Sequence, residues 1–198
     1  MAPRKRLRLG VTGHRVLAEG DEIEAGIETA LRGIERAWPG ATFTALSALA
    51  EGADRLVAER VLARPGATLV AVLPLPEAKY VEDFGSAASR AQFRDLLRRA
   101  ERRVELAAAG SRTLAYERVG DYILGRCDVL IAVWDGRPVQ GRGGTGAVVA
   151  GARERSKPLA WVHAGNRAPG TEEPTSLGDE QGMVTFENLG GAELESPA

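Results

Sequence analysis

Two short apolar runs constrain the fold of this chain more than any other feature. Residues 67–73 (ATLVAVL) and 128–134 (DVLIAVW) contain almost no polar side chains. Such runs are typical of strands in a parallel sheet, because helices cover both faces of the sheet. Pro74 follows the first run and Asp135-Gly136 follows the second. We therefore expect both segments to be strands in the interior of a layered domain.

Segments with helical spacing alternate with further strand-like segments along most of the chain. We expect helices at about 21–38, 53–64, 86–103, 112–126 and 145–155, and further strands at about 7–12, 42–48, 104–106 and 159–162. This alternation predicts an α/β fold, a Rossmann-like three-layer sandwich with a mainly parallel sheet and helices on both faces.

The length and the distribution of charge suggest one domain followed by a tail. A chain of 198 residues fits a single domain, which we assign to residues 1–165. From Gly165 onward the chain is rich in Gly, Pro and Glu and carries seven acidic residues but only one basic residue. We expect residues 166–198 to form an acidic tail, in which residues 183–186 could add an edge strand.

Composition excludes several classes of protein. One cysteine and two histidines provide neither a disulfide framework nor the usual ligands of structural zinc. No apolar run reaches the roughly 18 residues that cross a bilayer. The part before residue 165 carries 25 basic and 20 acidic side chains, too balanced for a protein that binds a nucleic-acid backbone. We expect a cytoplasmic protein without metal, cofactor, membrane contact or nucleic-acid partner, which binds a small anionic ligand.

Polar and glycine-rich residues gather where the predicted strands end. In parallel sheets, ligands bind beyond the carboxyl ends of the strands, at the point where the winding of the chain reverses. The loops concerned are 12–15, 47–54, 74–76, 134–145 and residue 163. These loops are therefore the predicted location of the site.

The loop at 141–146 (GRGGTG) matches the pattern G-x-G-x-x-G. It is a weak dinucleotide signature, because no acidic residue that could bind a ribose ends the following strand near residue 165. Its glycines still permit a close approach of the backbone, and the helix that begins here attracts phosphate at its N-terminus. We expect Gly143, Gly144, Thr145 and Gly146 to bind phosphate; the alternative is a flexible linker.

The first strand ends in Thr12, Gly13, His14 and Arg15. A hydroxyl, a backbone freed by glycine and a guanidinium group can together bind a phosphate or a ribose. In the alternative interpretation, His14 is a turn residue and Arg15 is a solvated charge.

Three acidic residues follow predicted strands. Asp54 lies at the start of a predicted helix, and a role in capping the helix N-terminus is enough to explain its carboxylate. Glu51 precedes Gly52 and is freer to bind a sugar hydroxyl. Asp135, before Gly136, emerges from a buried strand and is a candidate ribose ligand or catalytic carboxylate, or else part of an Asp-Gly turn. Glu51 and Asp135 are thus the candidate catalytic residues, and we expect the adjacent glycines, Gly52 and Gly136, to contact the nucleotide or its phosphate.

Two other features have simpler explanations. One predicted helix carries an arginine at every fourth position, namely Arg90, Arg94, Arg98 and Arg102. This row is either a solvated helix face or a surface for an anionic partner. Cys127 has no basic partner that would activate a thiolate other than Arg126, and we expect it in the core. The motifs of P-loop NTPases, serine hydrolases with a nucleophile elbow and zincins are absent from the sequence.

Three segments together resemble the SLOG superfamily. They are GVTGHR at 10–15, LAEGADR at 49–55, and DVLIAVWDG at 128–136 followed by Gly143-Gly144-Thr145. This Rossmann-like group includes the lonely-guy phosphoribohydrolases, related nucleotide-sensing modules and DNA-processing protein A. The resemblance covers residues 7–163 and implies a nucleotide or nucleotide-derived ligand beneath the glycine loop, and a homodimer or higher homo-oligomer.

The chain departs from the enzymes of this group at one position. The lonely-guy enzymes, which this segment resembles, carry a P-G-G-x-G-T-x-x-E pattern. The glutamate of this pattern assists cleavage of the bond between the base and the ribose phosphate. Val148 stands at that position here, and Arg142 stands at the start of the loop. Nucleoside deoxyribosyltransferases, which the segment also resembles, again require an acid at Val148. A valine cannot serve as nucleophile or base.

The sequence therefore favours a module that binds a nucleotide-like ligand, as a sensor or carrier. One alternative is an enzyme that cleaves or transfers at an N-glycosidic bond, with Glu51 or Asp135 as the working carboxylate. Another is an oligomeric interaction module with a vestigial pocket, in which the arginine row forms the interface.

Overall fold

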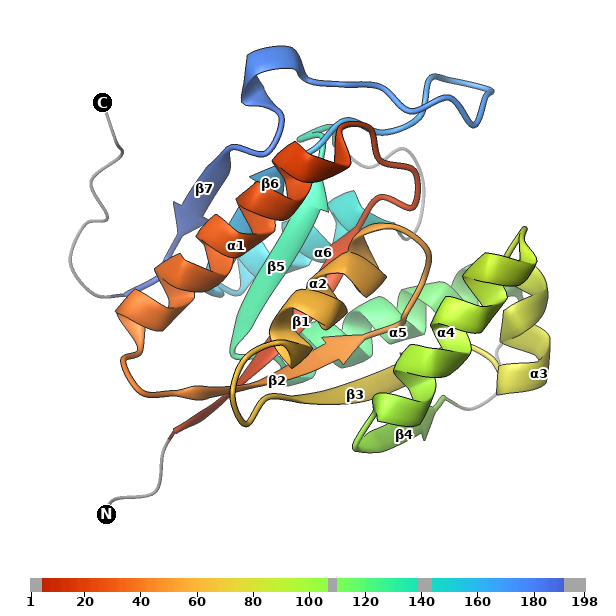
Figure 1. The fold of residues 1–198 in the computed structure, drawn as a ribbon, viewed down its shortest axis with the longest axis horizontal. Coiled ribbons are helices and arrows are strands. Elements are labelled where there is room, and N and C mark those ends of the chain that lie inside the picture. The colour runs from red at the N-terminus through yellow and green to blue at the C-terminus, as the bar shows by residue number, and fades with distance from the viewer. Residues whose placement is uncertain (1–4, 107–109, 139–143, 191–198) are drawn as a thin grey trace.

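The computed structural model describes residues 5–106, 110–138 and 144–190, and within these ranges the chain forms one seven-stranded sheet (Figure 1). The order across the sheet is β4-β3-β2-β1-β5-β6-β7. The strands are β1 (Arg6–Gly13), β2 (Thr42–Ser47), β3 (Thr68–Leu73), β4 (Arg102–Glu105), β5 (Val129–Trp134), β6 (Leu159–His163) and β7 (Val184–Glu187). All neighbouring strands are parallel except β6 and β7.

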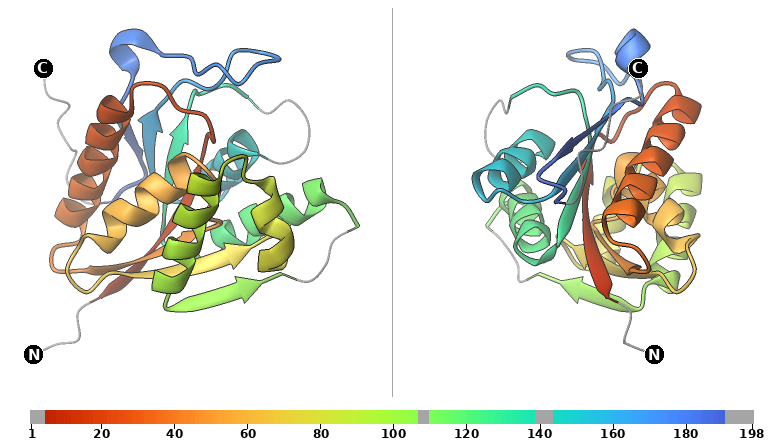
Figure 2. Two further views of the ribbon diagram at one scale, coloured as in Figure 1. Left: turned by 45° about the vertical axis from the view of Figure 1, so that its right-hand side comes forward. Right: turned by 90° about the vertical axis from the view of Figure 1, so that its left-hand side faces the viewer.

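Helices cover both faces of this sheet, so the predicted three-layer α/β architecture is confirmed. The helices are α1 (Gly20–Ala37), α2 (Ala53–Leu62), α3 (Glu77–Tyr80), α4 (Ala87–Arg99), α5 (Arg112–Arg126) and α6 (Thr145–Glu154). Figure 2 shows α5 and α6 on one face and α1 and α2 on the other. Two short 3-10 helices complete the elements, η1 (Val81–Asp83) and η2 (Gly178–Glu180).

The two apolar runs predicted as strands are β3 and β5, and β5 shows why such a strand needs no polar face. Val129, Ile131 and Val133 pack into the core beneath α1 and α2. Leu130, Ala132 and Trp134 alternate with them and pack against α5 and α6. All six residues of β5 are buried, because each face of the sheet is covered by helices.

The chain reverses its winding between β1 and β5. From β1 it proceeds outward through β2 and β3 to β4, and then returns to the other side of β1 and proceeds through β5 and β6 to β7. The carboxyl ends of β1 and β5 therefore lie side by side, with Gly13 opposite Val133. This is the position at which open α/β sheets bind their ligands.

Three local predictions need correction. Residues 79–84, a segment in which we expected no helix or strand, contain the end of α3 and all of η1, and Tyr80 within them is fully buried. Helix α4 ends at Arg99, because residues 102–105 pair with β3, so Arg102 belongs to β4 and not to a four-residue helix row. Within α4, Arg90 donates a hydrogen bond to the Phe84 carbonyl, and Arg98 pairs with Asp95.

The segment after residue 165 contributes to the folded body where the structure describes it. β7 pairs with β6 near the predicted edge strand, and Leu189 packs into the core. Cys127 is buried against Gly10 and α5, which confirms its predicted core position. In the described part of the chain, no helix has the length and apolar character needed to cross a membrane.

Candidate functional site

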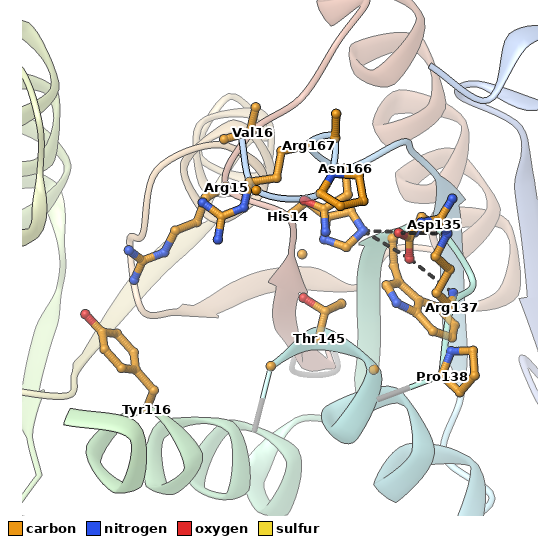
Figure 3. Close-up of a pocket in the computed structure, with 17 residues that line it drawn as sticks. His14, Arg15, Val16, Tyr116, Asp135, Arg137, Pro138, Thr145, Asn166 and Arg167 are labelled. Carbon is orange, nitrogen blue, oxygen red and sulfur yellow. Dashed lines mark hydrogen bonds and ion pairs between the residues drawn. The ribbon is translucent and has the colours of Figure 1, made fainter. Parts of the chain in front are cut away.

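A cavity of about 760 Å³ lies at the carboxyl ends of β1, β5 and β6 (Figure 3). Its walls come from four segments, residues 13–16, residues 134–138 without Gly136, residues 144–146 and residues 166–170, together with Tyr116 of α5. The predicted site residues that line it are Gly13, His14, Arg15, Asp135, Gly144, Thr145 and Gly146. Cavities of this size hold ligands as large as a nucleotide.

Gly13 allows β1 to turn into the cavity loop between two close neighbours. A Cβ atom at this position would lie 2.4 Å from Cβ of Ala53 and 2.7 Å from the carbonyl oxygen of Val133. The next residue, His14, donates its main-chain N–H to that same carbonyl at 3.0 Å. The His14 carbonyl in turn accepts the N–H of Ala53 at 3.0 Å. The loop is therefore fixed by both β5 and α2.

The His14 side chain is held as a neutral imidazole. Its Nε2 atom accepts the main-chain N–H of Asp135 at 3.0 Å, so the ring proton resides on Nδ1. Burial lowers the pKa of His14, against an opposing effect of the Asp135 carboxylate. In Figure 3 the two dashed contacts lie on one side of the ring, and the other ring nitrogen faces the cavity. Nδ1–H is thus placed as a donor to a ligand.

Asp135 lines the cavity, but its carboxylate has protein partners. One oxygen accepts the main-chain N–H of Arg137 at 3.1 Å, which closes a turn, and also lies 3.3 Å from Nε2 of His14. Only 6% of the side chain is exposed. The next residue, Gly136, has a φ of +77° and packs against the Trp161 ring. The Asp-Gly pair therefore forms the turn that was one of its two predicted interpretations, and Asp135, but not Gly136, lines the cavity.

Helix α6 opens toward the cavity, and the residue before it provides no side-chain cap. That residue is Gly144, which has a φ of +83° and no side chain that could accept from the first turn. Its carbonyl accepts the N–H groups of Ala147 and Val148 at 3.1 and 3.3 Å. The first N–H groups of a helix have no acceptor within the helix and carry a partial positive charge. At Thr145 and Gly146 these groups lie in the cavity wall.

Arg15 and Tyr116 form the opposite side of the cavity from Asp135 and Arg137, with Thr145 between them (Figure 3). The Arg15 guanidinium lies 5.2 Å from the centre of the Tyr116 ring, as in a cation–π pair. The Tyr116 hydroxyl donates a hydrogen bond to Asp83 of η1, and Asp83 also binds Arg112. Tyr116 was not predicted, because it occupies an ordinary position in the first turns of a helix.

Residues 166–170 form a wall that the sequence did not predict. The segment is attached through Gln181, which is 7% exposed. The Gln181 side-chain oxygen accepts the N–H groups of Gly165 and Leu177 at 2.9 and 3.2 Å. Its amide nitrogen donates to the Ala18 carbonyl at 3.1 Å. These bonds place Asn166 and Arg167 above the cavity, although their composition suggested a tail.

Several predicted residues lie outside this cavity wall. Glu51 accepts a hydrogen bond from the Ser89 hydroxyl of α4, and this placement does not support a contact with ribose. Gly52 packs against the carbonyls of His14 and Arg15, where a Cβ would be 2.5 and 2.4 Å from the two oxygens. Thr12 pairs with Ala132 inside the sheet. Gly143 lies outside the described residues.

Val148, the position at which related enzymes would carry an acid, has a packing role. A Cβ at Gly120 of α5 would lie 2.8 Å from the Val148 side chain, so the valine fills the contact between α5 and α6. Among the described residues, Asp135 is the only acidic residue that lines the cavity. Groups of three or more potential metal ligands are also absent from the described part.

The chain matches no protein-family model and no curated protein. A solved structure of a Moco carrier protein from Chlamydomonas reinhardtii is 22% identical to this chain, with a TM-score of 0.45, and covers 78% of this chain and 75% of its own. A second structure, titled molybdenum cofactor carrier protein MCP from the same organism, is 19% identical over the same shares, with a TM-score of 0.38. Similarity at this level transfers no function, and we base the function on the cavity itself.

Proposed function

We propose that this protein binds a phosphorylated small molecule, a nucleotide or a nucleotide-derived compound, and serves as its sensor or carrier. The single observation that supports this proposal most strongly is the N-terminus of α6 in the wall of the 760 Å³ cavity, where Gly144 provides no side-chain cap. A phosphate there would accept hydrogen bonds from free N–H groups and interact favourably with the helix dipole.

The charge of the cavity wall supports an anionic ligand. Arg15, Arg137 and Arg167 line the cavity, whereas Asp135 is its one described acid. His14 adds a neutral N–H donor, which serves an oxygen acceptor of the ligand. The location at the winding reversal between β1 and β5 is the usual one for nucleotides in open α/β sheets.

Hydrolysis of an N-glycosidic bond has less support from the geometry. Glu51 lies outside the cavity wall, and the Asp135 carboxylate already accepts the Arg137 N–H. A general base or nucleophile needs a carboxylate that reaches the substrate. The arginine row proposed for an interaction module is interrupted at Arg102. We therefore keep ligand binding as the proposed function.

The test is a thermal-shift screen of the purified protein. The panel holds nucleoside mono-, di- and triphosphates, NAD, ADP-ribose, cyclic nucleotides, inorganic phosphate and the molybdenum cofactor named for the similar structures. A ligand at one hundred times its dissociation constant adds about 2.7 kcal/mol of stability. For a domain of this size that corresponds to about 5–11 °C.

Two glycine variants separate binding from folding. Gly144→Asp places charge and bulk before α6, and we expect it to abolish the shift. Gly40→Asp is the matched control, because Gly40 also has a positive φ, of +75°, but lies in an open turn after α1 with no atom within 4 Å of an added Cβ. A panel without any shift from the folded protein would refute the proposal, and a shift that survives Gly144→Asp would refute the role of α6. Release of free base from a bound nucleotide would favour the enzyme.

A further inference from the structure

Arg15 differs from the other two arginines of the cavity wall in its charge environment. Arg137 lies 3.8 Å from the Asp135 carboxylate, and Arg167 forms an ion pair with Glu172. No carboxylate of the described residues forms an ion pair with Arg15. Of these three arginines, Arg15 is therefore the one without a carboxylate of the described residues at ion-pair distance, and the Asp54 carboxylate acts on its charge from farther away.

The direction of the Arg15 side chain is fixed by aromatic and polar contacts. Its guanidinium lies over Tyr116, and the Tyr116 hydroxyl is bound by Asp83. Asp83 also binds Arg112, so β1, α5 and η1 meet at this point. Tyr116 also interacts with Arg15 through a side-chain hydrogen bond, and a guanidinium group has five N–H donors, so further N–H groups can serve an acceptor in the cavity. A side chain held in this way loses less conformational entropy when it binds an anion.

Buried donors without acceptors lie behind this pair. Tyr80 is 0% exposed, its ring centre lies 6.2 Å from that of Tyr116, and its hydroxyl has no hydrogen-bond partner among the described residues. Arg55 is 2% exposed, and one terminal nitrogen of its guanidinium likewise has no partner in the described part. Asp54 is the buried acid of this region, and its carboxylate accepts the N–H of Ala50 at 3.3 Å. Neither Tyr80 nor Arg55 lines the cavity, so these groups add hydrogen-bond donors and positive charge behind Arg15 without contacting the ligand.

This region is separate from the N-terminus of α6. In Figure 3, the Arg15 guanidinium and Tyr116 lie to one side, Asp135 and Arg137 lie to the other, and Thr145 lies between them. A cavity of about 760 Å³ is also far larger than one phosphate requires. A phosphate bound at Thr145 therefore leaves the Arg15 side open to another part of the ligand.

We propose that Arg15, supported by Tyr116, forms a second anion-binding subsite, and that the ligand carries two separate anionic groups. This inference rests on the proposed function, since it assigns the first anionic group to the N-terminus of α6. The ligand class is a nucleotide-like phosphate ester with a second phosphate at a distance from the first. Tyr116 is a positioning residue, because it acts through the Arg15 guanidinium.

Calorimetric titration with three nucleotide forms tests the second subsite. The probes are the 5′-monophosphate, the 5′-diphosphate and the 3′,5′-bisphosphate of adenosine, and the same three forms of guanosine. We expect at least one doubly phosphorylated form to bind about ten times more tightly than the monophosphate, the difference that one good charged contact provides. Arg15→Gln should remove this tenfold advantage and leave the affinity for the monophosphate within about threefold of wild type.

The variants distinguish this inference from the proposed function. Arg94→Gln removes an exposed arginine of α4 outside the cavity wall and should leave all affinities unchanged. Tyr116→Leu should reduce the advantage of the doubly phosphorylated probe, whereas Tyr116→Phe, which keeps the ring, should retain most of it. Equal binding of mono- and doubly phosphorylated forms by the wild type, or an equal loss of both with Arg15→Gln, would overturn the second subsite and leave the proposed function standing. If none of the six probes binds to the folded protein, the second subsite is overturned, and the wider panel described above decides the proposed function.

Discussion

The main-chain N–H of Asp135 donates a hydrogen bond to Nε2 of His14 at 3.0 Å, across the ends of β5 and β1. Because this bond occupies the lone pair of Nε2, the ring keeps its proton on Nδ1. Burial lowers the pKa of His14, so the imidazole stays neutral near neutral pH. His14 is thus held as a fixed hydrogen-bond donor.

Two substitutions of His14 separate the role of Nε2 as an acceptor from the role of Nδ1–H as a donor. In His14→Gln, the side-chain amide reaches the position of Nε2 and accepts the Asp135 N–H, but the donor at Nδ1 is lost. We expect near wild-type stability and a ligand affinity about 3–10 times weaker, as for one neutral hydrogen bond. In His14→Asn, the donor is kept and the Asp135 N–H loses its acceptor, which costs about 1–3 kcal/mol of unfolding free energy. Chemical denaturation and calorimetry measure both effects, and equal behaviour of the two variants would contradict this assignment.

Alanine substitutions at Gly13 and at Gly125 should change the free energy of unfolding in opposite directions. Gly13→Ala would place a Cβ 2.4 Å from Ala53 and 2.7 Å from the Val133 carbonyl, and we expect it to destabilise the protein by about 1–3 kcal/mol through overpacking. Gly125 lies inside α5 with no atom within 4 Å of an added Cβ. Gly125→Ala should stabilise the protein by about 0.4–1 kcal/mol, because alanine restricts the unfolded chain and favours the helix. Urea unfolding of both variants gives the two signs, and a neutral Gly13→Ala would show that the β1 loop has room to move.

The fold could be predicted from the sequence because its main signals are local. The apolar runs at 67–73 and 128–134 identify strands buried on both faces, and the glycines at 13 and 144 mark turns at the ends of strands. The order of the strands then determines which loops meet. His14, Asp135 and Thr145 are brought together for this reason, although they are far apart in the sequence.

The remainder of the site depends on contacts that no local pattern reveals. Glu51 resembles a free carboxylate until Ser89 of α4 is placed beside it. Asn166 and Arg167 have the composition of a tail, but the three hydrogen bonds of Gln181 hold their segment over the cavity. Tyr116 becomes significant only when its distances to Arg15 and Asp83 are known.

Asp54 predicts a stability that depends on pH. Burial raises the pKa of this carboxyl from 3.8 to about 6, so the folded state binds a proton more tightly than the unfolded state does. Between these pH values the folded state holds more protons, and the free energy of unfolding therefore falls as the pH rises. The total loss from this group is about 3 kcal/mol.

Asp54→Asn should remove that contribution. We expect the difference in unfolding free energy between wild type and variant to shift in favour of the variant by about 2 kcal/mol between about pH 4.5 and about pH 7.5, because the rest of the change falls at lower pH. Comparison with the variant separates the pH dependence caused by Asp54 from that caused by His14. The lowered pKa of His14 makes the free energy of unfolding rise with pH. Asp95→Asn, at an exposed residue of α4 paired with Arg98, is the control and should follow the wild type. A difference that does not change with pH would show that the Asp54 carboxyl titrates alike in both states.

Gln181 provides a test of how the cavity wall at 166–170 is held. Gln181→Ala removes the one oxygen that accepts two main-chain N–H groups and the one donor to Ala18, and we expect a loss of about 1–3 kcal/mol, as for buried groups left unpaired. Gln181→Glu keeps the side-chain acceptor and loses the donor. Its effect on hydrogen exchange should therefore be smaller in the segment 165–177 than at Ala18. Hydrogen exchange measured by mass spectrometry resolves the two regions. We expect faster exchange over 165–177 in the alanine variant, together with weaker binding of any ligand that contacts Asn166 or Arg167. Unchanged exchange in this segment would mean that Thr175, which donates to the Asn166 carbonyl, suffices to hold the wall in place.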